Sequence, residues 1–234
     1  MSEELTCFIP LAHKSKEPVY QNWPDRGQTL CEAMGESQNI GLILGEKSGM
    51  LDVDLDCREA KYLAEIILPL PWATFDRGTP DSGHYLYQAK TTGPRKSLTS
   101  SDKSTLLELR GDRSQTMVPP SIHPNGVKLS FTAFNEDAAP VHYNDLLRSV
   151  YLLAACSEIM QNWQKGIRHK LALSFSGLAR KLGLEFNFVM QIVQKICKIK
   201  DDLELDDRVN TVRTTFDRRI DSIIGLSGLI ECLG

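Results

Sequence analysis

Two patterns that set the fold class meet in residues 51–68, which read LDVDLDCREAKYLAEIIL. The first six residues alternate apolar and acidic side chains, and this period of two predicts a β-strand with one apolar and one acidic face. The residues that follow repeat apolar side chains at helical spacing, with Ala60, Leu63, Ala64 and Ile67 on one side. A strand followed at once by an amphipathic helix predicts a domain that mixes both kinds of element.

The rest of the chain changes its pattern near Pro140. Residues 38–131 carry short β-favouring runs separated by Gly, Pro, Asp and Ser, which is typical of strands with tight connections. After Pro140 the apolar period becomes helical, and one predicted helix stops at Gly183, a good C-terminal cap. We therefore predict an α+β fold, with an α/β-type domain over residues 1–140 and a small all-helical domain over 141–234. The predicted strands are 40–44, 50–55, 73–75, 84–88, 105–110, 116–118 and 128–131, and the predicted helices after Pro140 are 145–163, 167–182 and 188–199.

Composition limits the class of protein. The 234 residues are 41% hydrophobic, which is enough for one large domain or two smaller ones with their own cores. No apolar run approaches the roughly 20 residues of a membrane-spanning helix, and the start of the chain lacks a basic segment followed by an apolar stretch. We therefore expect a cytoplasmic protein with no membrane partner. The six cysteines stand singly, so we expect reduced thiols and no structural zinc.

Charge is distributed unevenly along the chain. The formal net charge of -3 gives no sign of nucleic-acid binding, but eight Lys or Arg stand against one acid, Glu185, between Gln164 and Lys200. Such a basic helical segment suits a phosphate-binding module beside a cation site, and solvated helix faces explain the charge equally well. The candidates for DNA binding are Lys165, Arg168, Lys170, Arg180 and Lys181.

The acidic strand is the most informative candidate for chemistry. In a strand, Asp52, Asp54 and Asp56 project from one face about 6.6–6.8 Å apart. Three carboxylates on one face repel each other, and a hard divalent cation such as Mg²⁺ or Mn²⁺ relieves that repulsion. An exposed acidic strand is the alternative, but aspartate is poor in strands and the intervening apolar residues indicate that the other face is buried.

Three further segments carry polar groups that suit a site. A turn in TPDSGHYLYQ, residues 79–88, delivers His84 to the start of a strand, where its side chain can face a cleft. In LLELRGD, residues 106–112, Glu108 shares a strand face with Arg110, and an acid in so apolar a run needs either that arginine or a metal as partner. MVPPSIHPNG, residues 117–126, predicts a stiff loop that carries His123.

Two other classes of enzyme are excluded by spacing. GLILGEKS, residues 41–48, has only three residues between its glycines and does not fit the phosphate loop GxxxxGK[ST]. The sequence also has no GxSxG elbow and no cysteine with a plausible base, so nucleophilic catalysis has no support.

Taken in order, these segments resemble the prim-pol domain of the archaeo-eukaryotic primase (AEP) superfamily. The resemblance runs from about Pro10 to Phe131 and rests on NIGLILGEKSG before the aspartate strand, then LPLPWATFDRGTPDSGHYLY, then LELRGDRSQTMVPPSIHPNG. It implies an α/β N-terminal part combined with an RRM-like sheet. Two departures are Glu108, where the family often has Asp, and Asp56, which makes the register of the acid pair ambiguous.

The resemblance implies a DNA primase/polymerase, a nucleotidyltransferase that joins NTPs or dNTPs on a single-stranded DNA template and makes primers, with their extension left open. It implies that Asp52, Asp54 and Glu108 are catalytic and hold two Mg²⁺ or Mn²⁺ ions. Ser82 and His84 would bind the triphosphate of the incoming nucleotide. The further candidates for triphosphate binding are Arg77, Arg110 and Lys47.

Beyond Tyr143 the sequence resembles the helical region that follows the prim-pol domain in plasmid and phage replication proteins, as in GIRHKLALSFSGLARKLG. A helicase domain often comes next in those proteins, so the expected partners are template, primer strand, nucleotide and a helicase domain or protein. Two alternatives remain from the residues themselves. A metal-dependent nuclease uses similar carboxylates, and a non-catalytic DNA-binding replication initiator module can share the fold.

Overall fold

The computed structural model describes residues 6–37 and 39–233, which form two compact units. The first unit runs to residue 99 and continues over 105–152, and the second consists of residues 100–104 and the chain from 153 onward. The predicted boundary at residue 140 lies just before helix α3 (Tyr143–Gln161), whereas the units divide within that helix. The start of α3 belongs to the first unit because Tyr143 is fixed there, its hydroxyl donating to the carbonyl of Pro94 at 2.6 Å.

The larger sheet of the first unit is built around β3, which pairs antiparallel with β7 on one side and β5 on the other. Leu51, Val53 and Leu55 are fully buried on one face of β3, and the aspartates alternate with them on the other. The predicted strand over 50–55 is therefore confirmed in both its bounds and its register. The strand order is β6 (Lys96–Thr99), β7 (Thr105–Arg110), β3 (Met50–Leu55), β5 (Gly83–Thr91), β4 (Ala73–Asp76) and β9 (Ser130–Phe134), with β10 (Val141–His142) beside β5.

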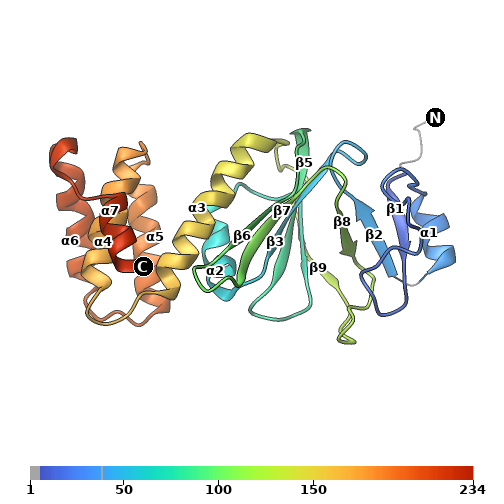
Figure 1. Cartoon of the computed structure of the whole chain (residues 1–234), viewed down its shortest axis with the longest axis horizontal. Coiled ribbons are helices and arrows are strands. Elements are labelled where there is room, and N and C mark those ends of the chain that lie inside the picture. The colour runs from blue at the N-terminus through green and yellow to red at the C-terminus, as the bar shows by residue number, and fades with distance from the viewer. Residues whose placement is uncertain (1–5, 38, 234) are drawn as a thin grey trace. The chain divides into compact units, whose positions relative to one another are not determined.

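A smaller sheet faces the acidic side of β3. It has the order β1 (Phe8–Leu11), β2 (Asn39–Ile43) and β8 (Gln115–Val118), and it carries helix α1 (Leu30–Glu36), as Figure 1 shows. Ile9 and Ile40 of this sheet share one core with Phe75 and Leu86 of the larger sheet. Because Leu86 lies directly opposite Asp52, and opposite residues share a face of a sheet, the aspartate face of β3 looks toward the smaller sheet.

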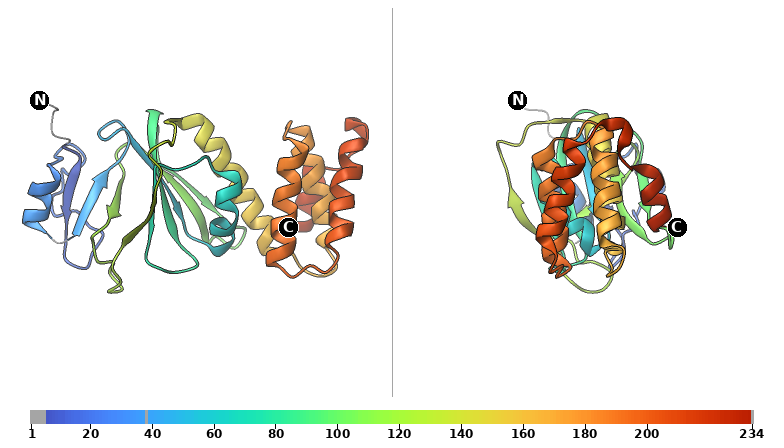
Figure 2. Two further views of the ribbon diagram at one scale, coloured as in Figure 1. Left: turned by 180° about the vertical axis from the view of Figure 1, so that it is seen from behind. Right: turned by 90° about the vertical axis from the view of Figure 1, so that its left-hand side faces the viewer.

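Helix α2 (Arg58–Ile67) covers the apolar face of the larger sheet, as the view from behind shows (Figure 2). Its buried side chains are Ala60, Leu63, Ala64 and Ile67, which confirms the predicted apolar side. The larger sheet therefore lies between a helical layer and the smaller sheet, and its polar groups gather on the side away from α2.

The second unit is helical, as predicted. It contains α4 (Arg168–Lys181), α5 (Phe186–Ile199), α6 (Leu205–Asp217) and α7 (Leu226–Leu233), with a short 3₁₀ turn over Ile220–Ser222. The helix predicted over 167–182 is found as α4, which buries Leu171, Phe175 and Ala179. Leu182, at the end of the predicted range, lies one residue past the end of α4 and is 67% exposed. In the described part of the chain, no helix has both the length and the apolar composition that crossing a lipid bilayer requires.

A buried polar cluster ties this unit together. The Asp202 carboxylate accepts hydrogen bonds from the indole of Trp163 at 3.0 Å and from Nε of Arg208 at 3.1 Å, and it lies 3.3 Å from the Arg168 guanidinium. Burial opposes ionisation of Asp202, but these donors and the backbone amide of Glu204 outweigh it and lower its pKa. A fully satisfied buried carboxylate of this kind fixes one arrangement of the helices around it.

Candidate active site

The pairing of three strands gathers the predicted catalytic residues on one face. Asp54 lies opposite His84 of β5 and Glu108 of β7, and Asp52 lies opposite Arg110 of β7. Since opposite residues share a face of a sheet, these five side chains share the face that looks toward the smaller sheet. The arrangement follows from the alternation of β3, which places its acids two residues apart.

Arg110 lies among the three acids and offsets part of their charge. Its Nη2 lies 2.5 Å from Asp54 and 2.9 Å from Glu108, and its Nη1 lies 4.0 Å from Asp52. The three acids are at most 6% exposed, and the acids raise the pKa of the buried guanidinium although burial opposes its charge. Arg95 pairs with the other oxygen of Glu108, a contact between strand and loop that no sequence pattern indicated. Two arginines thus hold the Glu108 carboxylate in its charged form, and its pKa is lowered despite burial.

Contacts at the edge and on the face of its imidazole ring hold His84 in place. Its Nδ1 lies 2.9 Å from Oδ2 of the fully buried Asp52 and 3.5 Å from the hydroxyl of Thr116. The ring of Phe75 stacks on the imidazole with 4.5 Å between centroids and 7° between planes. Burial opposes the charged imidazolium, but the carboxylates of Asp52 and Asp54 outweigh it and raise the pKa of His84.

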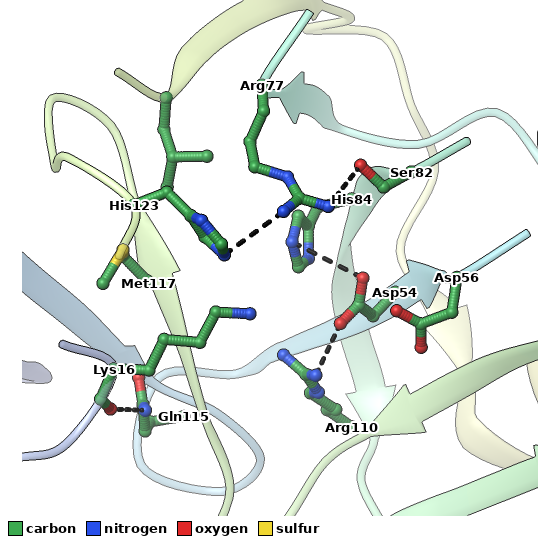
Figure 3. Close-up of a pocket in the computed structure, with 11 residues that line it drawn as sticks. Lys16, Asp54, Asp56, Arg77, Ser82, His84, Arg110, Gln115, Met117 and His123 are labelled. Atoms are coloured by element: carbon green, nitrogen blue, oxygen red, sulfur yellow. Dashed lines mark hydrogen bonds and ion pairs between the residues drawn. The ribbon is translucent and has the colours of Figure 1, made fainter. Parts of the chain in front are cut away.

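A pocket opens beside these residues (Figure 3). Asp54 and Asp56 border one side, and the basic side chains of Lys16 and Arg77 border the other. Burial raises the pKa of Asp56 to about 6, and the negative charge of Asp54 adds to the effect. Asp52 and Glu108 are not among the lining residues, whereas Asp56, whose place in the acid pair the sequence left ambiguous, is one of them. The remaining lining residues are Ser82, His84, Arg110, Gln115, Met117, His123 and Leu129.

The loop between β4 and β5 brings Arg77 and Ser82 to the pocket. Arg77 donates to the Ser82 hydroxyl at 2.9 Å, and Gly78 takes the left-handed backbone, with φ of +72°, that the turn between them requires. Lys61 of α2 braces this loop because its ammonium donates to Asp76 and to the carbonyls of Thr79 and Ser82 at 2.8–2.9 Å. The structure thus places predicted residues Arg77, Ser82 and His84 around one pocket.

The loop between β8 and β9 supplies His123. The side chain of Asn39 holds this loop through two hydrogen bonds with the backbone of Ile122, at 2.9 and 2.8 Å. His123 Nε2 lies 3.3 Å from Arg77 Nη1. Burial together with this cation lowers the pKa of His123, although the hydrogen bond that its Nδ1 donates to the side-chain carbonyl of Asn125 opposes the shift. A neutral imidazole here leaves the basic side of the pocket to Arg77 and Lys16.

Lys16 is a lining residue that sequence reasoning missed as a site candidate. Its ammonium group points into the pocket in Figure 3, and its backbone carbonyl accepts a hydrogen bond from the Gln115 side chain at 2.9 Å. The two residues are 99 positions apart, so no local spacing connects them.

Lys47 lies outside this pocket. It borders a separate depression together with Asp25, Glu46, Asp112 and Arg113. The structure therefore does not bring this predicted nucleotide-binding residue to the others.

The predicted DNA-binding residues of the helical unit have contacts within that unit. Arg168 pairs with Asp202, and Lys170 pairs with Glu231. The side chain of Arg180 donates to the carbonyls of Thr215 and Arg218, and that of Lys181 donates to the carbonyl of Ile223. These contacts give four of the predicted DNA-binding residues a role in packing within the unit. A role of these four residues and of Lys165 in DNA binding remains a prediction.

The acids fit a hard divalent cation by donor type, since carboxylate oxygens are the ligands that Mg²⁺ and Mn²⁺ prefer. Within residues 6–37 and 39–233, however, no three His, Cys, Asp or Glu side chains are gathered closely enough to hold a metal ion as they stand. The Arg110 guanidinium bridges Asp54 and Glu108. A cation that binds these acids therefore competes with Arg110 for the same charges.

The first unit is thus an α+β domain in which a pocket with an acidic and a basic side lies beside the larger sheet. Residues 3–141, more than half of the chain, match the family model described as bifunctional DNA primase/polymerase, N-terminal. The chain belongs to this prim-pol family of the AEP superfamily, which confirms the predicted family and the α+β fold followed by helices. No curated protein matches the sequence.

Proposed function

We propose that this chain is a template-directed primase-polymerase that transfers nucleotides from NTPs or dNTPs. The observation that carries the proposal is the pocket with Asp54 and Asp56 on one side and Lys16 and Arg77 on the other. A nucleoside triphosphate with its divalent cation has the complementary distribution, because the phosphates are anionic and the ion is cationic. Each side of the pocket therefore has a matching group on one ligand.

The residues of the basic side act on the triphosphate. Arg77 and Lys16 attract the phosphate oxygens, and the guanidinium of Arg77 has the planar donor geometry that phosphate groups match. Ser82 and His84 add a hydroxyl and an imidazole at the same place. Binding the phosphates takes Arg77 from its present partners, the Ser82 hydroxyl and His123. This exchange of polar partners costs little because both arrangements satisfy the guanidinium.

The acids hold the divalent ions. We propose Asp54 and Asp56 as ligands of Mg²⁺ or Mn²⁺ because they border the pocket, with Glu108 as the third acid on the same face. Asp52 is fully buried and does not line the pocket. We therefore do not propose it as a metal ligand, although the sequence predicted that role. Two such ions, when bound, lower the pKa of an attacking 3′ hydroxyl and neutralise the departing pyrophosphate. Arg110 then turns from the acids toward the phosphates, where it keeps its predicted role in nucleotide binding.

The proposed DNA partners are a single-stranded template and a primer strand. The basic segment between Gln164 and Lys200, which includes Lys165 ahead of α4, offers positive charge for their phosphates. Binding that depends on this charge weakens steeply with salt. A helicase domain or protein fits the same role in replication of a plasmid or phage. Each of these partners is a proposal from the family resemblance and from the charge of that segment.

The test is synthesis on unprimed single-stranded DNA with Mn²⁺ and labelled NTPs or dNTPs, each class supplied separately. We expect template-dependent product from the wild type and none from Asp54→Asn. Asp81→Asn is the matched control, because Asp81 lies on the adjoining loop and pairs with the exposed Arg58. A shortened template would support the metal-dependent nuclease instead. Retention of DNA without product or cleavage would support the non-catalytic initiator module.

A further inference from the structure

The acids at positions 52, 54 and 56 lie in different surroundings, with Asp52 and Asp54 on β3 and Asp56 directly after its end. Asp54 and Asp56 border the pocket, whereas Asp52 has no exposed surface and lies beneath it. The neighbours of Asp52 are protein groups, with His84 Nδ1 at 2.9 Å and the Arg110 guanidinium at 4.0 Å. The alternation of the strand alone does not distinguish these residues, but their burial does.

The contact between Asp52 and His84 determines how the imidazole is presented. A carboxylate at Nδ1 keeps a proton on that nitrogen, since the carboxylate only accepts hydrogen bonds. Nε2 is then the nitrogen that faces the acids and the pocket, 3.5 Å from Asp54. The stacked ring of Phe75 prevents the imidazole from tilting away.

From this geometry we infer that Asp52 is the positioning residue of His84 and does not ligate a metal ion. Its buried carboxylate holds the imidazole so that Nε2 meets the triphosphate of an incoming nucleotide. The inference rests on the proposed function for the identity of that ligand, and it assigns distinct roles to the acids of the predicted pair. Asp54 binds a cation at the pocket, and Asp52 acts through His84.

One feature of Asp52 makes the opposite assignment testable. Its Oδ1 is buried and has no hydrogen-bond partner in the described structure, so a metal ion reaching this oxygen would satisfy it. If Asp52 were a ligand, its loss would weaken metal binding without nucleotide present. If Asp52 acts through His84, its loss weakens nucleotide binding and leaves metal binding intact.

The experiment measures the two affinities separately on the full chain. Free Mn²⁺ is followed by electron paramagnetic resonance, and binding of a non-hydrolysable nucleoside triphosphate with Mn²⁺ is followed by calorimetry. For Asp52→Asn we expect unchanged Mn²⁺ affinity and nucleotide affinity weaker by about 10- to 100-fold, the range for losing a hydrogen bond to a charged group. Asp54→Asn, the matched variant on the same strand face, should lose Mn²⁺ affinity.

A double variant removes the uncertainty about folding. In a background of His84→Ala, the further change Asp52→Asn should not weaken nucleotide binding, because the residue through which Asp52 acts is gone. If the losses add, or if Asp52→Asn loses Mn²⁺ as Asp54→Asn does, Asp52 is a ligand and the inference is overturned.

A spectroscopic signature makes the positioning test independent of any activity. The Nδ1 proton of His84 should give a downfield, slowly exchanging NMR signal in the wild type, assigned by its loss in His84→Ala. The signal should disappear or shift in Asp52→Asn, and its absence from the folded wild type would overturn the inference. A wild type that shows the signal but binds neither Mn²⁺ nor nucleotide would refute the proposed function. The positioning of His84 by Asp52 would still stand.

Discussion

Replacing Arg110 by Gln tests whether one guanidinium keeps the acidic face of β3 stable when no metal is bound. Arg110 contacts Asp54 at 2.5 Å and Glu108 at 2.9 Å, and its side chain is only 17% exposed. Glutamine keeps much of the length of the side chain but removes the charge. The variant therefore leaves the three buried carboxylates to the contacts of Arg95 with Glu108 and of His84 with Asp52 and Asp54, which do not replace the lost charge.

The size of the effect follows from burial. Removing one partner of a buried ion pair costs about 3–5 kcal/mol, and each kcal/mol lowers the melting temperature of a domain of about 150 residues by roughly 2–4 °C. We thus expect the melting temperature of the first unit to fall by roughly 6–20 °C. Arg58→Gln is the control because its pair with Asp81 is about half exposed, and such surface pairs contribute at most about 1 kcal/mol.

The assay is thermal unfolding with and without Mn²⁺. Because the variant frees the acids from their internal cation, Mn²⁺ should raise the melting temperature of Arg110→Gln more than that of the wild type. Two results would refute this reasoning: an Arg110→Gln variant as stable as the Arg58→Gln control, or a destabilised variant that gains no more from Mn²⁺ than the wild type.

Three further changes test other parts of the structure. Asp202→Asn should cost the helical unit about 3–5 kcal/mol in urea unfolding, with Asp201→Asn, an exposed neighbour, as control. Since its folded pKa lies below the ordinary 3.8, the stability that Asp202 contributes is present above about pH 4 and lost as the pH falls further; a flat acid profile would contradict this. Gly177→Ala should destabilise the same unit by about 1–3 kcal/mol, because an added Cβ would lie 1.6 Å from the carbonyl oxygen of Ile224. An unchanged midpoint of urea unfolding would show that the backbone moves to make room for the Cβ. Lys16→Ala should weaken nucleotide binding about tenfold, the effect of one charge-assisted hydrogen bond, without changing the melting temperature. Lys47→Ala is the control, because Lys47 borders the separate depression, and it should leave nucleotide binding unchanged. Equal losses of affinity in the two variants would disprove the difference between the two lysines.

The parts of the fold that sequence predicts are those in which one face is apolar. The strand β3 and helix α2 show clean periods of two and 3.6, and the structure has the same buried faces. Helix α6 was not predicted separately because its buried side includes Arg208, Thr211 and Thr215, which give no apolar stripe. Strand β6 is largely exposed at the edge of its sheet, so alternation does not mark it. The predicted strand at 128–131 is found at Ser130–Phe134, where the pairing with β4 contains a bulge.

The site is predictable to the extent that it is local. Alternation along β3 and β7 was enough to place Asp52, Asp54 and Glu108 on shared strand faces. Sequence does not reveal which of these acids reaches the pocket, because that depends on how the smaller sheet covers the face. Arg95 and Lys16 come from loops that approach only in the folded chain. Their contribution follows from tertiary packing and has no signature in the spacing of residues.

In the proposed function, the pocket between the acids and Arg77 receives a nucleotide with its cation. The most direct test is a crystal structure of the wild type with Mn²⁺ and a non-hydrolysable nucleoside triphosphate. We expect an anomalous peak for manganese beside Asp54 and Asp56, with the triphosphate against Arg77, Ser82 and His84. A manganese peak or a triphosphate bound elsewhere, with the guanidinium of Arg110 still bridging its carboxylates, would contradict it.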